Sequence, residues 1–318
     1  MSPEEFARHG HQIVDWIARY MQEAERYPVR SQVEPGDILA QLPAAAPEHG
    51  EPMDRILADF ERVIVPGMTH WQHPSFFAYF PANASGPSIL GELLTAGLGA
   101  QCMMWQTSPA ATELEERVLD WLRGMIALPE GWAGVIQDTA STATLCALLT
   151  AREVATGFAT NRQGLARWDP PLTVYASEEI HASIPRAVKI AGFGADALRL
   201  IPTDARLAMR PDALEQAIVA DTRDGLKPVC VVACLGTTST TAFDPLKEIG
   251  DIARRHGLWL HVDAAFAGSA ATLPELRWMH EGIELVDSYV FNPHKWLFTN
   301  FDLSAYYVAD PTALVRTM

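Results

Sequence analysis

The chain has 318 residues, of which 48% are apolar and 20% charged, an ordinary composition for a globular protein with one large core. Its 39 acidic and 24 basic side chains give a net charge of −15, which argues against nucleic acid or an anionic membrane surface as the main partner. Charged residues follow Met1 at once and no apolar run has the length of a membrane span, so we expect a cytoplasmic protein without a secretory signal.

The first segment predicts an amphipathic helix that ends near Tyr27. Ser2 can cap this helix, Pro3 suits its first position and Glu5 completes a capping box. Apolar residues then recur at helical spacing: Phe6, Ile13, Val14, Ile17 and Met21. A proline-rich connector follows at 33–52. Because such a helix must bury its apolar face against something else, we expect a second copy of the chain as its partner, and therefore a homodimer.

After about Ala111, strand-like apolar segments alternate with helical patterns. The strand-like segments are 135–136, 172–175, 198–201, 229–235, 258–262, 288–291 and 304–308. The clearest helical patterns are 112–128, 141–155, 211–220 and 246–256. This alternation predicts an α/β fold with a mainly parallel, doubly wound, seven-stranded sheet and helices on both faces. No helix is expected after the last strand.

Polar side chains gather where these strands end, which is where open α/β sheets bind ligands. Asp263 ends the strand 258–262, and the threonine-rich segment 237–241 follows the strand 229–235. Residues 138–142 follow the first strand and open a helix. Helix starts rich in small hydroxyl residues bind phosphate through their backbone amides, although Ser141 or Thr142 could equally be a plain N-cap.

Lys295 is the most informative residue, because it is one of four lysines and lies between apolar segments, beside His294. Burial disfavours the ammonium form and lowers the pKa of a lysine, and the neutral amine can form a Schiff base with an aldehyde. An aspartate in the same site, such as Asp263, is what a pyridoxal phosphate enzyme needs for the ring nitrogen of its cofactor. A solvated strand end or a salt bridge is the alternative interpretation of Asp263, but the small residues that follow it would let a flat ring come close.

Metal binding is a further alternative for this region. His261 and Asp263 are two residues apart and face the same side of a strand, but no third ligand stands at informative spacing. The four cysteines form no CxxC pair, and Cys230 and Cys234, in an apolar strand-like segment, are expected to be buried free thiols. We therefore expect no metal.

Two further features fit a ligand site. His181 follows the strand 172–175 at the same predicted edge of the sheet, although a histidine at a helix start often lies in solvent. An irregular aromatic segment contains Trp71, His73, Phe76, Phe77, Tyr79, Phe80 and Pro81. Its spacing favours a loop lined with aromatic rings over a helical stripe, and such a wall suits an aromatic substrate. Core packing is the alternative.

Taken together, these motifs resemble the pyridoxal-phosphate group II decarboxylases, and most closely the aromatic-L-amino-acid decarboxylases. The resemblance covers essentially all 318 residues and rests on segments including Thr69-His70-Trp71, Phe76 to Pro81, Leu235-Gly236-Thr237-Thr238, His261-Val262-Asp263-Ala264-Ala265 and Asn292-Pro293-His294-Lys295-Trp296. It implies fold type I of the pyridoxal-phosphate enzymes. It also implies an N-terminal helical arm and dimerisation segment at 1–85, a large cofactor-binding domain at 86–318, and a small C-terminal domain that is absent from this chain.

The resemblance also implies residue roles. Lys295 would bind pyridoxal 5′-phosphate as a Schiff base, Asp263 would keep its ring nitrogen protonated, and His181 would stack on the ring. The phosphate would be fixed by Ala140, Ser141, Thr238 and Asn292, with Ala265 and His294 close to the ring. The substrate side chain would be held, partly across the dimer interface, by Trp71, Tyr79, Phe80, Pro81, Gln101, Met103 and His181.

The reaction implied by the resemblance is decarboxylation of an aromatic L-amino acid to its amine and carbon dioxide. Two alternatives stay open: oxidative conversion to an aromatic aldehyde, and a truncated chain that binds the cofactor without turnover. In the family, one loop residue distinguishes decarboxylation from aldehyde formation. It is usually tyrosine, and aldehyde-forming members have phenylalanine instead. This residue would lie beyond Met318. Ala82 stands where the animal enzyme has a hydroxyl residue, so the preferred aromatic amino acid also stays open.

Overall fold

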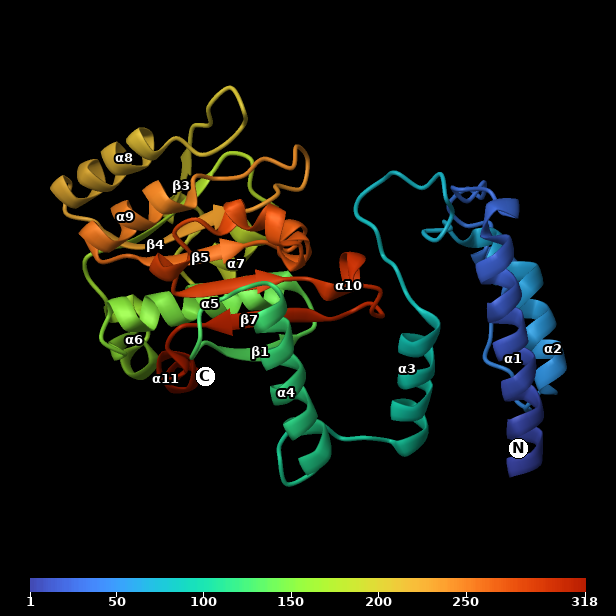
Figure 1. The fold of residues 1–318 in the computed structure, drawn as a ribbon. Helices are drawn as coiled ribbons and strands as arrows, with labels where there is room; N and C mark the ends of the chain where they lie inside the picture. Colours follow the sequence, from blue (N-terminus) through green and yellow to red (C-terminus); the bar gives the residue numbers. More distant parts are fainter. The chain divides into compact units, whose positions relative to one another are not determined.

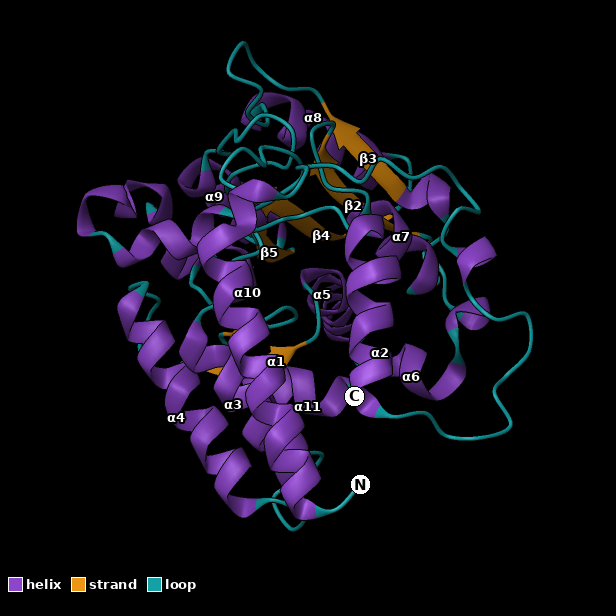
Figure 2. Ribbon diagram, turned by 90° about the vertical axis from the view of Figure 1, so that its right-hand side faces the viewer, coloured by secondary structure: helices purple, strands orange, loops and turns teal.

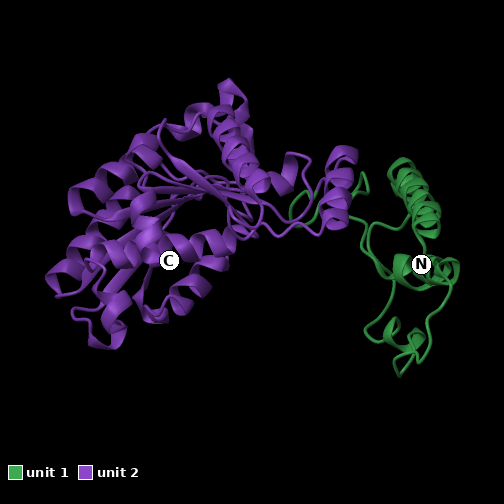
Figure 3. Ribbon diagram, turned by 90° about the horizontal axis from the view of Figure 1, so that it is seen from below, with its two compact units in different colours: residues 1–82 green, residues 83–318 purple.

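The computed structural model describes residues 1–318, which form two compact units, Met1–Ala82 and Asn83–Met318 (Figures 1 and 3). No helix in the chain combines the length and the apolar character that crossing a membrane requires.

The first unit begins with α1 (Pro3–Glu23), whose start confirms the predicted capping box. The Ser2 hydroxyl accepts the Glu5 amide at 3.2 Å, and the Glu5 carboxylate accepts the Ser2 amide at 2.7 Å. A 3₁₀ turn (Ala24–Arg26) ends the helical stretch just before Tyr27, as predicted. The remaining helical elements are α2 (Met53–Asp59), a π turn (Phe60–Ile64) and 3₁₀ turns at Leu39–Gln41 and Val65–Gly67.

Aromatic rings contact one another across this unit. The ring of Trp16 on α1 meets Phe60 edge-on with centroids 5.0 Å apart, and the Tyr20 hydroxyl lies 2.9 Å from Nδ1 of buried His70. Tyr27 stacks on His70 at 4.6 Å. Several apolar side chains of α1 nevertheless stay exposed, including Phe6 and Met21. The assignment of this segment to dimerisation stays a prediction.

The second unit is built on a seven-stranded sheet, which confirms the predicted fold class. Its strands are β1 (Ala133–Gln137), β2 (Leu172–Ser177), β3 (Leu198–Ile201), β4 (Lys227–Cys234), β5 (Trp259–Asp263), β6 (Ser288–Phe291) and β7 (Ser304–Val308). Their order is β1-β7-β6-β5-β4-β2-β3. Strand β7 is antiparallel to both of its neighbours and the other pairings are parallel, so the sheet is mixed but mainly parallel.

Helices cover both faces of the sheet (Figures 1 and 2). The helices of this unit are α3 (Gly86–Leu98), α4 (Pro109–Met125), α5 (Ala140–Ala155), α6 (Ala159–Gln163), α7 (Ser183–Ile190), α8 (Pro211–Arg223), α9 (Leu246–His256), α10 (Pro293–Trp296) and α11 (Pro311–Thr317). Leu214 of α8 and Ile249 of α9 share one core cluster with Val231 of the sheet. Leu148 of α5 and Ile184 of α7 belong to another cluster on the opposite face. The sheet is therefore shielded from water on both sides.

The expectation that no helix follows the last strand was wrong. The Asp310 carboxylate accepts the Thr312 amide at 2.9 Å and Pro311 occupies the first helical position, so α11 has an ordinary helix start. Ala313 of this helix is buried against the cluster that contains α5. The pair Asp310-Pro311 was the signal in the sequence that pointed to this helix.

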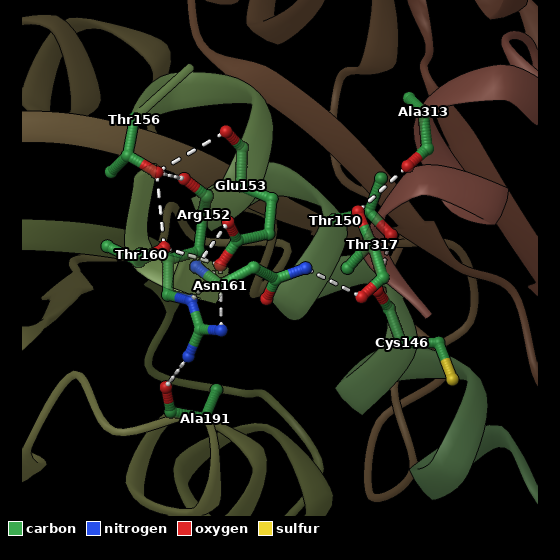
Figure 4. A network of polar contacts seen from close by, with 10 residues as sticks. All are labelled: Cys146, Thr150, Arg152, Glu153, Thr156, Thr160, Asn161, Ala191, Ala313 and Thr317. Carbon is green, nitrogen blue, oxygen red and sulfur yellow. Dashed lines mark hydrogen bonds and ion pairs between the residues drawn. The ribbon is translucent and has the colours of Figure 1, made fainter. Parts of the chain in front are cut away.

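A buried polar network ties the carboxyl ends of three helices together (Figure 4). The fully buried Glu153 of α5 accepts Nε and Nη2 of Arg152 at 3.0 and 2.8 Å, the Thr160 hydroxyl, and the Asn161 amide at 3.0 Å. Arg152 also donates to the carbonyl of Ala191, just after α7, and the Asn161 side chain donates to the carbonyl of Thr317 at the end of α11. Each polar partner of Glu153 would lose a bond if the carboxylate were removed.

We predict that Glu153→Ala lowers the free energy of unfolding by about 3–5 kcal/mol, because it leaves the Arg152 charge without its carboxylate in a buried place. The matched control is Asp224→Ala, which breaks the exposed pair of adjacent residues Arg223–Asp224 and should cost less than about 1 kcal/mol. Urea unfolding measures both changes. Equal losses in the two variants would contradict the stabilising role of the buried network.

Candidate functional site

The alternation of side chains along the strands places Cys234 and Asp263 on the same face of the sheet. Val232 of β4 and Trp259 of β5 pack in the core cluster of α5 and α7, so residues an even number of positions further along each strand face the same side. Cys234 and Asp263 are also direct neighbours in the pairing of β4 with β5. The carboxyl ends of these two strands therefore present a thiol and a carboxylate side by side.

Asp263 is buried rather than solvated, with 5% of its surface exposed. Its Oδ1 accepts the amide of Ala265 at 3.0 Å, which fixes the carboxylate at the point where β5 ends. The alternative of a solvated strand end is therefore wrong. The carbonyl of half-buried Ala265 in turn accepts the Asn292 amide at 3.1 Å, so the segments that follow β5 and β6 are hydrogen-bonded to each other.

Lys295 lies in the four-residue helix α10, which begins at Pro293, shortly after β6 ends at Phe291. Burial lowers the pKa of the Lys295 amine, and the charge of the Asp263 carboxylate opposes that shift. Desolvation is the larger effect, so the amine loses its proton more readily than an ordinary lysine. Strand β6, which Lys295 follows, is the neighbour of β5, so Lys295 lies at the same edge of the sheet as Asp263 and Cys234.

The start of α5 lies at the same edge of the sheet, where it follows β1. Thr139 is the N-cap, because its hydroxyl accepts the Thr142 amide at 3.3 Å, so the alternative that Ser141 or Thr142 caps the helix is wrong. Exposed Ser141 and half-buried Ala140 occupy the first turn, where backbone N–H groups have no acceptor within the helix. This arrangement suits an anionic group at the helix start.

The loop after β4 turns sharply at Gly236. Its φ of 80° lies in the left-handed region, and an added Cβ would come within 2.7 Å of the Ala267 Cβ, so glycine meets both requirements. Next, the buried Thr237 hydroxyl lies 2.7 Å from that of Thr240 and accepts the Ala242 amide at 2.9 Å. Thr238 is exposed at the tip of this loop.

Asn292 and His294, which precede Lys295, are each held by a hydrogen bond to the segment 303–304. The buried Asn292 accepts the Ser304 hydroxyl at 2.7 Å, and Nδ1 of buried His294 accepts the Leu303 amide at 2.8 Å. Burial lowers the pKa of His294, and the neighbouring Lys295 charge adds to that effect. The residues around Lys295 are therefore fixed by β7 and the segment before it.

His181 lies in the turn between β2 and α7 and is exposed. Its Nδ1 accepts the amide of Ser183 at 3.2 Å and lies 2.8 Å from the Ser183 hydroxyl. These bonds orient the ring and leave Nε2 to face outward. This geometry fits both a histidine at a helix start and a ring that stacks on a ligand, so the stacking role stays a prediction.

The predicted substrate residues are divided between the two units. Trp71, Tyr79, Phe80 and Pro81 belong to the first unit, in an irregular segment that matches the predicted aromatic loop. Within it, the Trp71 ring lies 5.7 Å from Tyr79 and 5.1 Å from Phe80, centroid to centroid. Exposed Gln101 and Met103 belong to the second unit. The joint role of the two groups stays a prediction.

The metal-site alternative for His261 is wrong. The chain contains no group of three or more histidine, cysteine or acidic side chains that could hold a metal ion. His261 is fully buried, with Nδ1 2.9 Å from the Ser288 hydroxyl and Nε2 3.4 Å from that of Thr144. Burial lowers its pKa to about 4, so the ring is neutral and serves the packing between β5 and α5.

Sequence reasoning overlooked two buried residues that shape this edge of the sheet. Cys234 was expected only as a buried thiol, although its position at the end of a strand next to that of Asp263 could have identified it. The buried carboxylate of Asp244 accepts the amides of Cys234 and Met209, both at 2.7 Å. It thereby joins the end of β4 to the segment before α8. No local pattern in the sequence predicts the role of Asp244, because its partners are distant in sequence.

The fit to a pyridoxal-type cofactor rests on this donor set. A buried amine with a lowered pKa can react with an aldehyde, and a fixed buried carboxylate can pair with a protonated ring nitrogen. The first turn of α5 and the threonine loop offer amides and hydroxyls at the same edge, as a phosphate requires. The residues present therefore fit the group.

The comparisons agree with this chemistry. The chain belongs to the pyridoxal-dependent decarboxylases, because the family model described as the pyridoxal-dependent decarboxylase conserved domain matches residues 35–318. The cofactor of this family is pyridoxal phosphate, as predicted.

Two curated relatives show the range of activities among similar proteins. The chain is 45% identical to a phenylacetaldehyde synthase of Petunia hybrida, covering all of this chain and 63% of the relative. It is 44% identical to an aromatic-L-amino-acid decarboxylase of Bos taurus, covering 99% of this chain and 66% of the relative. The chain thus spans somewhat less than two thirds of the length of these relatives.

A solved structure confirms the fold. The crystal structure of Catharanthus roseus tryptophan decarboxylase in complex with L-tryptophan superposes with a TM-score of 0.94 at 41% identity, covering all of this chain and 68% of that one. The predicted resemblance to aromatic-amino-acid decarboxylases of fold type I is therefore confirmed.

We predict that the folded chain loses stability through Asp244 as the pH rises from about 4 to about 6. Burial, aided by the charge of Asp204, raises the pKa of Asp244 from 3.8 to about 6, so between these values the folded chain holds a proton that the unfolded chain has released. The contribution is roughly 3 kcal/mol at most.

The measurement is urea unfolding of the wild type and of Asp244→Asn at several pH values. The variant loses an acceptor for one of the two amides and is weaker throughout, but it cannot titrate. The stability of the wild type minus that of the variant should therefore decrease across this window. A difference that stays constant or increases with pH would show that Asp244 is not protonated in the folded chain.

Proposed function

We propose that this chain belongs to a pyridoxal phosphate-dependent enzyme that decarboxylates aromatic L-amino acids to the corresponding amines and carbon dioxide. The observation that carries the proposal is half-buried Lys295, whose amine has a lowered pKa, after β6 at the edge of the sheet where the neighbouring β5 presents the fixed carboxylate of Asp263. Relatives of matching fold support it, including the tryptophan decarboxylase of Catharanthus roseus and the aromatic-L-amino-acid decarboxylase of Bos taurus.

The residues of the chain would act as follows. The neutral Nζ of Lys295 binds the cofactor aldehyde covalently, and Asp263 holds a proton on the ring nitrogen. The first turn of α5, with Ala140 and Ser141, binds the phosphate together with Thr238 and Asn292. Ala265 and His294 would lie close to the ring, and His181 would stack on its face. When bound, the cofactor supplies an electron sink for breaking the bond between Cα and the carboxylate.

Lys295 would also have a second role. Its Nζ is in a desolvated setting that favours the neutral amine, so it could hold or release a proton beside the reacting centre. The aromatic residues Trp71, Tyr79, Phe80 and Pro81, with Gln101 and Met103, would surround the substrate side chain. We propose the cytoplasm as the location of the protein.

We predict that Lys295→Ala abolishes the absorbance of the cofactor Schiff base in protein purified with pyridoxal phosphate, because no other amine occupies this site. Lys189→Ala is the matched control, since Lys189 is exposed on α7 and its loss should leave the spectrum unchanged. The measurement is the visible spectrum before and after borohydride reduction, with peptide mapping of the reduced adduct. A spectrum that survives in Lys295→Ala would refute the proposal.

The reaction products separate the proposal from its alternatives. With an aromatic L-amino acid, we expect carbon dioxide and the amine in equal amounts, without ammonia or hydrogen peroxide. The similarity to a phenylacetaldehyde synthase supports the oxidative alternative, for which aldehyde, ammonia and peroxide would appear. A normal Schiff base spectrum without any product would favour the third alternative, a chain that binds the cofactor without turnover.

A homodimer is the proposed assembly. Four leucines of α3, namely Leu90, Leu93, Leu94 and Leu98, are each at least half exposed, and α1 also keeps apolar side chains in solvent. Apolar surfaces of this kind are typical of protein–protein contacts.

We predict that the wild type has about twice the 34.9 kDa mass of one chain in light scattering, and that Leu94→Asp shifts it toward one chain because a charge is costly in an apolar contact. Val315→Asp is the control, since Val315 is an exposed apolar residue of α11. A wild type at the mass of one chain would refute the dimer. A Leu94→Asp variant that stays dimeric would remove α3 from the interface.

A further inference from the structure

The residue that follows Lys295 is bonded to the segment that follows Asp263. The indole N–H of Trp296 donates to the carbonyl of Phe266 at 2.6 Å. The two rings also stack, with centroids 5.4 Å apart and planes 19° from parallel. A polar bond and a ring contact thus join the residue that follows Lys295 to the segment that follows Asp263.

These contacts begin where the sheet ends. The pairing of β5 with β6 continues past the strands through two bonds, from the Ala264 amide to Val290 at 2.9 Å and from the Asn292 amide to Ala265 at 3.1 Å. After Asn292 the chain leaves the sheet and enters α10. The next link between the two segments is the bond from Trp296 to Phe266.

Helix α10 is too short to hold its own orientation. It has four residues, and a helix of one turn gains little from its internal bonds. On its other side the Leu303 amide donates to His294, which fixes the turn to the segment before β7 and not to β5. The position of Lys295 relative to Asp263 therefore depends on contacts such as that of Trp296.

We propose that Trp296 is a positioning residue for Lys295, whose indole N–H holds the lysine turn at a fixed place relative to Asp263. The inference rests on the proposed function of Lys295 and adds a residue to it. The simpler alternative is that Trp296 only fills space, in which case the stacked ring suffices and the N–H contributes nothing to the lysine.

The position of Lys295 relative to Asp263 affects the pKa of its amine. The titratable groups near Lys295 include the Asp263 carboxylate of β5, the Cys234 thiol of β4, which burial keeps neutral by raising its pKa, and His294 on the same turn. The Asp263 carboxylate favours the protonated amine. If the turn moves away from Asp263, this stabilisation weakens and the amine loses its proton at lower pH.

The experiment compares Trp296→Phe, which keeps an aromatic ring but removes the N–H donor, with Phe266→Leu, which keeps the carbonyl acceptor but removes the stacked ring. Trp278→Phe is the control for the chemical change, since Trp278 lies in the 3₁₀ segment Pro274–His280 and contacts Phe243 instead. The readouts are the pH midpoint of Schiff base formation with pyridoxal phosphate and amide hydrogen exchange of residues 294–296 without it.

We expect Trp296→Phe to lower the pH midpoint and to speed exchange of these amides about fivefold, as the loss of one hydrogen bond implies. Phe266→Leu and Trp278→Phe should keep the wild-type midpoint. In an Asp263→Asn background, Trp296→Phe should give no further shift of the midpoint. The Asp263 charge is then gone, so its distance from Lys295 no longer affects the amine.

A Trp296→Phe midpoint equal to that of the wild type overturns the inference, even if its melting temperature falls, because a residue that only fills space would behave in this way. A midpoint that shifts as much in Phe266→Leu as in Trp296→Phe also overturns it. A wild type that forms no Schiff base overturns the proposed function instead, and the exchange measurement then still tells whether the bond holds the turn.

Discussion

The burial of the Lys295 amine together with the Asp263 carboxylate is the constraint on which the rest of this structure depends. Removing a lysine from water favours its neutral form, and a nearby carboxylate favours the charged one. Desolvation is the larger effect here, so the pKa of Lys295 lies below that of an ordinary lysine. An amine balanced in this way can react with an aldehyde and can also carry a proton, which are the two tasks that its proposed chemistry requires.

The fold supplies the geometry for this pair. Parallel strands end at one edge of a sheet and the helices that follow them begin there, so strand-end carboxylates and helix-start amides meet. Asp263 ends β5, Lys295 follows β6, and α5 opens after β1. At the far end of α5, the buried Glu153 and its partners join the carboxyl ends of α5, α7 and α11 (Figure 4). Helix α5, whose first turn lies at the candidate site, is thus fixed to its neighbours at the end away from the site.

Local patterns in the sequence were sufficient for much of this. The capping box of Ser2 and Glu5 and the seven strands depend on neighbouring residues, and both were confirmed. Lys295 and Asp263 were found because each directly follows or ends an apolar strand. The contacts of Asp244 and Trp296 were not predictable in this way, because they join segments 10 to 35 residues apart that meet only after folding.

Other predictions depend on more than one folded unit. Trp71 and Tyr79 lie in the first unit and Gln101 and Met103 in the second, so their shared role in binding a substrate rests on the family resemblance. The missed helix α11 is a different case, since Asp310-Pro311 is a local signal that was present in the sequence. The helix was not predicted because few residues follow the last predicted strand, 304–308.

The central claim is tested most directly by the titration of the lysines themselves in the chain without cofactor. The chain has four lysines, so selective labelling of the side chain gives four NMR signals, which single lysine-to-arginine variants assign. We predict that the Lys295 signal titrates below 10.5, whereas that of Lys247, paired with Asp251, titrates above it. In Asp263→Asn the Lys295 midpoint should fall further. A Lys295 signal that titrates at or above 10.5 would contradict the account.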